Sequence, residues 1–277
     1  MCIRDRPKDA ILVVDLSMSI NDKPPSMTFD QVISEAISNS EIPQVGLRKL
    51  INAINYSKTD SDIKGLYLTG NLQSINFGSG YAAMTEVRQA LIDFKTSGKP
   101  IYAYMVNAMP RDYYLISCAD TIYMNPFGEL MFNGLGVEMM FYANAFKKWG
   151  IGAQPIRVGA FKAGIEPYVQ DQMSEENRKQ TMVLIEGLWD SMASEVAESR
   201  GITPEDLDTL VGSNGFFDAD AAKNGGLVDK LVYFDEILQT LKKVAGDDSE
   251  ERTSLVTSAC HLSRLCSNME QTLMSGY

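Results

Sequence analysis

The sequence predicts an α/β fold built around a parallel sheet. Short apolar runs rich in β-branched residues alternate along the chain with segments whose apolar residues recur every three or four positions. Such alternation of strands and helices is typical of parallel sheets with right-handed crossover connections. The 277 residues suffice for one large α/β domain or two small ones. A content of 45% hydrophobic and 22% charged residues is ordinary for a globular protein.

The first half of the chain carries four predicted strands, at Ile11–Leu16, Ile63–Thr69, Ile101–Val106 and Thr121–Met124. The helices predicted between them cover 45–57, a segment that contains Met84, Val87, Leu91 and Phe94 and ends at Gly98, and Arg111–Ala119. Two connections are long. The polar segment 17–44 is interrupted by prolines and is expected to hold one short helix over 29–37, and 70–80 is a loop rich in glycine and asparagine.

The second half of the chain is predicted to be mainly helical. Residues 125–136 are rich in glycine and strand-like in parts, and they are followed by a helix over 139–149 and a strand-like segment over 154–158. A short helix opens at Thr203-Pro204, because proline suits a first helical turn. The last predicted element covers Phe234–Val244.

The longest predicted helix begins after Ser174 and ends at Gly201. Serine is a preferred N-cap residue, the two glutamates that follow suit the helix dipole, and glycine is the usual residue after a helix end. One apolar stripe runs along this helix and consists of Met182, Ile185, Trp189, Met192 and Val196. Such a stripe indicates core or a subunit interface rather than a ligand site.

Composition excludes several kinds of partner. The net charge of −11 argues against nucleic acid, because phosphate binding needs a basic surface. Four cysteines (Cys2, Cys118, Cys260, Cys266) form no C-x-x-C pair, and the single His261 leaves any metal site short of ligands. No cofactor or metal is therefore predicted. No apolar stretch reaches the roughly 20 residues that span a bilayer, and Met1–Arg6 lacks the apolar core of a signal peptide.

The stretch R-V-G-A-F-K-A-G-I-E-P-Y, Arg157–Tyr168, holds the main candidate catalytic residue, Lys162. A lysine among small and apolar neighbours is a candidate general base, because desolvation disfavours the ammonium form and a neutral amine can take a proton from a hydroxyl nucleophile. The alternative is a surface lysine paired with Glu166. A direct pair would favour the ammonium, so base catalysis requires that Glu166 points away from Lys162.

This stretch, with D-Q-M-S-E-E-N-R (Asp171–Arg178), resembles the lysine segment of the signal peptide peptidase A (protease IV) family. The resemblance extends over most of the chain. It includes I-L-V-V-D-L-S from Ile11, S-G-K-P-I-Y-A-Y from Ser97, Y-Y-L-I-S-C-A-D from Tyr113 and N-G-G-L-V-D-K-L from Asn224. The family implies a serine endopeptidase with a Ser/Lys dyad on a crotonase/ClpP-like fold of repeated β-β-α units. Its long members have two repeats, of which the amino-terminal one carries the lysine.

The resemblance also implies that this chain lacks the nucleophile. In the carboxy-terminal repeat of the family the serine lies in an S-G-G-Y-W context. Aligning that context on Tyr113 puts Pro110 at the serine position and Arg111 and Asp112 at the two glycines. Proline has no hydroxyl group and no backbone donor. Lys162 is therefore the catalytic residue that the resemblance assigns to this chain, and the serine is expected in a second repeat.

Other serines fit a nucleophile poorly. Ser79 lies in G-S-G-Y-A, which lacks the spacing of a G-x-S-x-G elbow, while Ser117 and Ser174 fit a helix residue and a helix cap. A single histidine disfavours a Ser-His-Asp triad. Asn71-Leu72 stands where the family has a glycine turn that donates to the oxyanion.

Gly134, Leu135 and Gly136 are the predicted substrate-binding residues. They resemble a family strand along which an extended peptide pairs by β-addition.

Three domains follow from this interpretation: an unstructured or foreign segment 1–9, a protease repeat 10–245 and a flexible or non-native tail 246–277. The predicted partners are signal peptides and other peptide substrates, the missing carboxy-terminal repeat and further copies in a homo-oligomer. The family implies a bacterial cell-envelope location, with the domain outside the cytoplasm and an inner-membrane anchor absent from this chain. Two alternatives remain, a non-catalytic assembly or peptide-binding scaffold and, ranked last, a crotonase-like acyl-CoA enzyme.

Overall fold

The computed structural model describes residues 9–22, 44–72, 80–156, 159, 161–213, 215–246 and 255–257. The strands of its main sheet are β1 (Ala10–Asp15), β4 (Ile63–Thr69), β5 (Ile101–Ala108), β6 (Thr121–Met131), β7 (Phe216–Asp218), β8 (Lys230–Leu231) and β9 (Leu255–Thr257). Within the described residues these seven strands follow the order β7-β6-β5-β4-β1-β9, with β8 paired to β6. Every pair is parallel except β6–β7. The predicted α/β fold with a mostly parallel sheet is confirmed.

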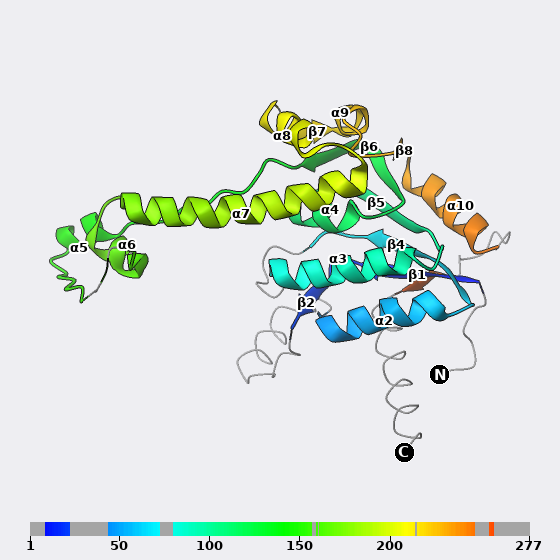
Figure 1. Ribbon diagram of the computed structural model, residues 1–277, viewed down its shortest axis with the longest axis horizontal. Coiled ribbons are helices and arrows are strands. Elements are labelled where there is room, and N and C mark those ends of the chain that lie inside the picture. Colours follow the sequence, from blue (N-terminus) through cyan, green and yellow to red (C-terminus); the bar gives the residue numbers. More distant parts are fainter. Residues whose placement is uncertain are drawn as a thin grey trace, which may run out of the picture.

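Helices cover both faces of this sheet, and others lie on an arm that extends away from it (Figure 1). The helices of the described residues are α2 (Leu47–Thr59), α3 (Tyr81–Lys95), α4 (Pro110–Ile116), α5 (Ala143–Lys148), α6 (Glu166–Val169), α7 (Glu175–Arg200), α8 (Pro204–Ser213), α9 (Ala219–Asn224) and α10 (Phe234–Val244), with the 3₁₀ turn η1 (Ala163–Ile165) before α6. Alternate residues of β1 face opposite sides. Leu12 and Val14 join the core under α2, α3, α4 and the end of α7, whereas Ile11 and Val13 pack with α10.

Two three-residue strands, β2 (Ser19–Asn21) and β3 (Gln44–Gly46), pair in parallel as a small separate sheet. Val45 and Gly46 therefore belong to a strand, and the helix predicted over 45–57 begins only at Leu47. The short helix predicted over 29–37 lies outside the described residues. So does most of the segment 246–277, of which Gly246 and β9 are described, and β9 pairs with β1. The division into 1–9, 10–245 and 246–277 stays a prediction.

Strand β6 is much longer than the predicted strand 121–124. After a register shift between Met105 and Asn107, Asn107 pairs with Glu129 and Ala108 pairs with Leu130. Gly128 makes this second stretch possible, because a Cβ at this position would lie 2.1 Å from the backbone oxygen of Val106. The long β6 carries the chain to the point where it leaves the sheet.

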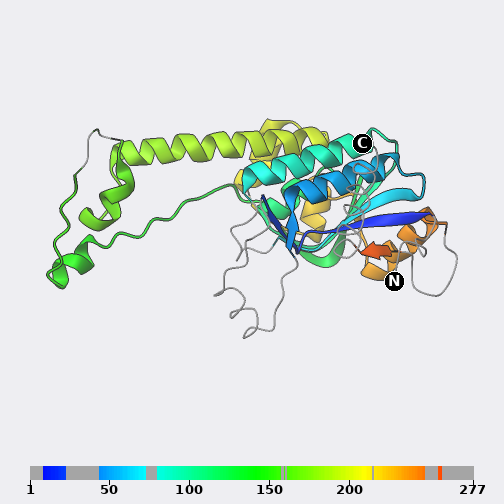
Figure 2. The same cartoon turned by 90° about the horizontal axis from the view of Figure 1, so that it is seen from below.

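Beyond β6 the chain forms an arm, defined as the described part of residues 133–188: an extended segment, α5, η1, α6 and the amino-terminal part of α7 (Figures 1 and 2). The predicted cap and stop of α7 are both present, since Ser174 accepts from Asn177 N and Gly201 is left-handed. Helix α5 is shorter than predicted, and residues 154–156 form no strand. No helix in the described residues is both long and apolar enough to cross a membrane.

The apolar stripe of α7 divides into two parts. Met192 and Val196, near its carboxyl end, are buried in the core. Met182, nearer the amino end, is 43% exposed. Val183 and Leu184, on the same turn, are each 63% exposed. The carboxyl-terminal part of the stripe is core, as predicted, whereas the amino-terminal part presents an apolar surface on the arm.

Candidate active site

Lys162 lies near the far end of the arm, directly before η1 and α6. Its side chain is exposed, so the described residues do not provide the apolar enclosure expected from the neighbouring sequence. Two of the neighbours, Arg157 and Val158, lie outside the described residues. Removal of Lys162 from water would therefore need a segment beyond the described residues.

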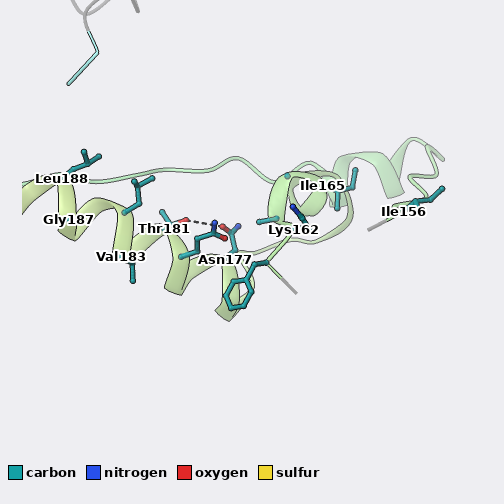
Figure 3. A pocket seen from close by; sticks show the side chains of 13 residues that line it. Ile156, Lys162, Ile165, Asn177, Thr181, Val183, Gly187 and Leu188 are labelled. Atoms are coloured by element: carbon teal, nitrogen blue, oxygen red, sulfur yellow. Dashed lines mark hydrogen bonds between the residues drawn. The ribbon is translucent and has the colours of Figure 1, made fainter. Parts of the chain in front are cut away.

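An apolar groove of about 990 Å³ begins at Lys162 and follows α7 (Figure 3). The apolar side chains that line it are Ile156, Phe161, Ile165, Val183, Leu184 and Leu188. Figure 3 shows Lys162 beside Ile165, near the turn of α7 that bears Asn177 and Thr181. No serine is among the described lining residues, and the hydroxyl of Thr181 donates to Asn177 Oδ1 at 3.3 Å. Among its described lining residues the groove presents one lysine amine and an apolar surface but no serine hydroxyl.

Glu166, which the sequence placed as the possible partner of Lys162, is fully buried and bound to the start of α7. Its carboxylate accepts from Ser174 Oγ at 2.6 Å, from Ser174 N at 3.3 Å and from Asn177 Nδ2 at 2.9 Å. None of the ion pairs found among the described residues joins Glu166 to Lys162. Glu166 thus fastens α6 to α7, and the lysine segment follows the direction of α7.

Three aromatic rings of the arm stack on one another beside the lysine segment. The ring centroid of Tyr142 is 6.5 Å from that of Phe146 and 6.1 Å from that of Tyr168, and Phe146 and Tyr168 are 6.0 Å apart. Tyr142 N also donates to Pro167 O at 2.6 Å. These contacts join the extended segment, α5 and α6 into one unit. The sequence analysis did not predict this aromatic cluster.

The predicted substrate residues Gly134, Leu135 and Gly136 lie in the extended segment directly after β6. They adjoin the sheet end of the arm, whereas Lys162 lies near its far end (Figure 1). The structure therefore does not bring the two predicted sites together within this chain. Leu135 is partly exposed, and no strand is described as its partner.

The position that the resemblance assigns to the serine, Pro110, is the first residue of α4. The neighbouring Asp112 is buried and its carboxylate accepts three hydrogen bonds: from Leu72 N to Oδ1 at 2.6 Å, from Met109 N to Oδ2 at 2.9 Å and from Asn71 Nδ2 to Oδ2 at 3.2 Å. The amide of Leu72 is where the family resemblance expects an oxyanion donor. Here the Leu72 amide already donates to the carboxylate of Asp112 in the same chain.

Burial raises the pKa of the Asp112 carboxyl above its usual range, and the hydrogen bonds from Met109, Leu72 and Asn71 offset part of this rise. A raised folded pKa adds stability that is complete below the unfolded value of about 4 and is lost as the pH rises through the folded pKa. We expect wild type to lose stability relative to Asp112→Asn as the pH rises above about 4, measured by urea unfolding. The exposed Asp93→Asn on α3 is the control and should show no such trend.

The remaining serine candidates already have structural roles or cannot be placed. Ser117 is fully buried and donates to Tyr114 O at 3.0 Å. Ser174 caps α7 and donates to Glu166. Ser79 lies outside the described residues. No group of three potential metal ligands occurs in the described part of the chain.

Comparison with known proteins identifies the family of this chain. The family model described as "Peptidase family S49" matches residues 93–247, more than half of the chain and the whole arm. The chain belongs to peptidase family S49. The S49 match spans Lys162, Pro110 and Asp112, but it does not by itself assign a role to any of them.

This S49 chain is 28% identical over 247 residues to "Protease 4" of Salmonella typhi, an alignment that covers 85% of this chain and 39% of that protein. It is 27% identical over 231 residues to "Serine protease SPPA, chloroplastic" of Arabidopsis thaliana, covering 83% and 33% respectively. These names confirm the resemblance to signal peptide peptidase A and a serine protease family. The chain spans well under half the length of both relatives.

A solved structure described as an enoyl-CoA hydratase/isomerase family member is 15% identical to the S49 chain, with a TM-score of 0.42. The alignment covers 74% of this chain and 66% of that one. The evidence for the α/β fold is therefore the strand pairing within this chain.

Sequence reasoning found Lys162 and Pro110 but missed two side chains that shape the site. Asp112 is the third residue of a helix that opens with proline, a position where a carboxylate commonly bonds the backbone before the helix. That spacing could have indicated its role. Glu166 was considered as the acid partner of Lys162 or of Arg157, because its bonds to Ser174 and Asn177 depend on how α6 folds back on α7.

Proposed function

We propose that this chain is the lysine-bearing repeat of a serine endopeptidase that degrades cleaved signal peptides and other peptides. Lys162 is the general base, and the serine nucleophile lies in a second repeat. The enzyme works as a homo-oligomer in the bacterial cell envelope, anchored in the inner membrane with this domain outside the cytoplasm. Membership of the S49 family and the fraction of each relative that the chain spans support this proposal.

The observation that carries the proposal is the position of Lys162 at the end of an open apolar groove. In the described residues no acidic side chain forms an ion pair with it, and no serine lines the groove. A second repeat that covers Val183 and Leu184 would bury apolar surface and exclude water from the amine. Desolvation favours the neutral amine that a general base requires.

In the proposed reaction Lys162 Nζ takes the proton of the serine Oγ while that oxygen bonds to the carbonyl carbon of the peptide. The peptide C–N bond then breaks, and the leaving amine takes the proton from Nζ. Water next attacks the acyl group, again giving its proton to Nζ, and the serine leaves with a proton restored. The oxyanion donors are expected from the second repeat, because the amide of Leu72 is bonded to Asp112.

One alternative has its own support in the structure. Pro110 in place of a serine and the bond from Leu72 N to Asp112 leave this repeat without a reaction centre of its own. A chain that only assembles with other copies, or holds a peptide in the apolar groove, would show the same features. The two functions differ in whether catalysis depends on Lys162.

The test compares this chain with the longer polypeptide that contains the second repeat, on an unfolded protein substrate and on a peptide ester. We expect no hydrolysis by this chain alone and clear hydrolysis by the longer one. Circular dichroism of the isolated chain serves as the folding control. Hydrolysis by the isolated chain that is unchanged by Lys162→Ala would overturn the proposal, and an inactive longer protein that still binds peptide would favour the scaffold.

A further inference from the structure

Helix α7 is anchored at only one end. Its carboxyl-terminal part is buried against the core through Met192, Ala193 and Val196, while the part before Leu188 extends away from the sheet (Figure 1). Glu166 ties α6 to the free end through Ser174 and Asn177. The direction of α7 at its anchored end therefore sets where the lysine segment lies.

The anchored end is held by Arg88, a buried arginine of α3 that is 1% exposed. On the α7 side, its Nη2 donates to Glu195 O at 2.7 Å and to Ser199 Oγ at 2.6 Å. Its Nε forms an ion pair with Glu195 Oε2 at 3.2 Å, at an angle that does not make a hydrogen bond. Two residues one turn apart on α7 are thus held by a single side chain.

On the α4 side, Nη1 of Arg88 donates to Ser117 Oγ at 2.8 Å and also to the backbone oxygen of Tyr114. The guanidinium carbon lies 4.8 Å from the centre of the Tyr114 ring. The Tyr114 hydroxyl donates to Glu195 Oε2 at 2.7 Å, which closes the network between α3, α4 and α7. A lysine could not reproduce this, because only the planar guanidinium presents a fork of fixed donors.

Because α7 is long, a small tilt of the helix at the Arg88 network produces a large displacement of the arm. Glu195 and Asn177 are 18 positions apart, or about 27 Å along a helix, so a tilt of about 5° at the network moves the free end by roughly 2 Å. Misplacing a reacting group by about 1 Å can cost roughly 100-fold in rate.

We infer that Arg88 is a positioning residue for Lys162: by clamping α7 to α3 and α4 it fixes the direction of the arm that presents the lysine to its partner serine. The inference about the serine rests on the proposed function. The inference about the direction of the arm rests on the network alone and can be measured in this chain. A purely structural role would change the stability of the fold without changing where the arm points.

The measurement is the distance distribution between spin labels on Asn55→Cys in α2 and Lys179→Cys in α7, both exposed positions. Cys118 stays unlabelled, because it is buried and burial raises its pKa to about 11; Cys2, Cys260 and Cys266 are replaced by serine. We expect Arg88→Met to broaden the distribution roughly twofold or to shift its centre by about 2 Å or more, from the lever length above. Lys95→Met, which removes the ion pair to Asp120 from the same helix without contacting α7, should leave it unchanged.

Because Arg88→Met can impair folding, Glu195→Gln is the second variant: it keeps the size of the side chain and removes the charge at a partly exposed site. Distributions like wild type in Glu195→Gln and in folded Arg88→Met would overturn the inference. In the polypeptide with both repeats, the variants should lower kcat at least about tenfold with little change in KM, because substrate still binds while the base is misplaced. If Lys162→Ala proved active there, the proposed function would fail while the spin-label result still decided the role of Arg88.

Discussion

Replacing Lys162 by alanine in the polypeptide that contains both repeats should abolish peptide hydrolysis, with a loss of at least about 10³-fold in kcat. Alanine cannot accept the serine proton, and in the described residues no other amine lines the groove. Peptide binding should persist, because the apolar lining is untouched. The measurement is steady-state hydrolysis of an unfolded protein substrate, with substrate binding measured separately.

Two further variants make this result specific. Lys179→Ala removes an exposed lysine from the same arm, outside the groove, and should retain full activity. Lys162→Arg keeps a positive charge but cannot act as a base, since guanidinium stays protonated in proteins. We expect Lys162→Arg to be as inactive as Lys162→Ala. Substantial turnover by either Lys162 variant would reject the Ser/Lys assignment.

Elements whose signals are local were predicted well from the sequence. The strands β1 and β4 are apolar runs that any parallel sheet buries, and α10 was predicted with its observed bounds. The ends of α7 were identified from Ser174 and Gly201, because serine and glycine are the residue types that commonly cap the two ends of a helix. These features need no knowledge of distant parts of the chain.

Elements that depend on a distant partner were predicted poorly. The second stretch of β6 was predicted only as strand-like in parts, because its strand pairing depends on the new register that Asn107 and Ala108 of β5 offer. Conversely, the strand-like residues 154–156 lie on the arm with no described strand beside them, and apolar alternation alone does not make a strand. Local patterns indicate which residues could pair, whereas pairing is decided by neighbours in space.

The candidate site shows the same division. The residues around Lys162 indicated a lysine suited to base catalysis, but its exposure depends on which polypeptide covers the groove, and local sequence cannot show this. That Pro110 stands at the position which the resemblance assigns to the serine was visible in the sequence. The reason that the Leu72 amide is engaged was not, because Asp112 reaches it from 40 positions away.

Phe132→Ala should lower the free energy of unfolding by about 3–5 kcal/mol, the largest stability loss that we expect from a single substitution. Phe132 directly follows β6 and is fully buried. Its ring centroid is 5.3 Å from that of Tyr113 in α4, edge-on, and 5.2 Å from that of Trp189 in α7. Removing the ring leaves a cavity where the sheet, α4 and the anchored part of α7 meet, and side chains on three elements lose contacts together.

Urea unfolding followed by far-ultraviolet circular dichroism measures this loss, and Phe127→Ala is the matched control. Phe127 lies in β6, five positions earlier, but is 83% exposed, so its truncation should change the free energy of unfolding by no more than about 0.5 kcal/mol. If Phe132→Ala does not fold, Phe132→Leu should show a smaller loss of the same sign, since leucine fills part of the cavity. A loss below about 1 kcal/mol for Phe132→Ala would mean that the ring does not hold the anchored part of α7 against the core. The anchored end of α7 would then depend mainly on polar contacts such as those of Arg88.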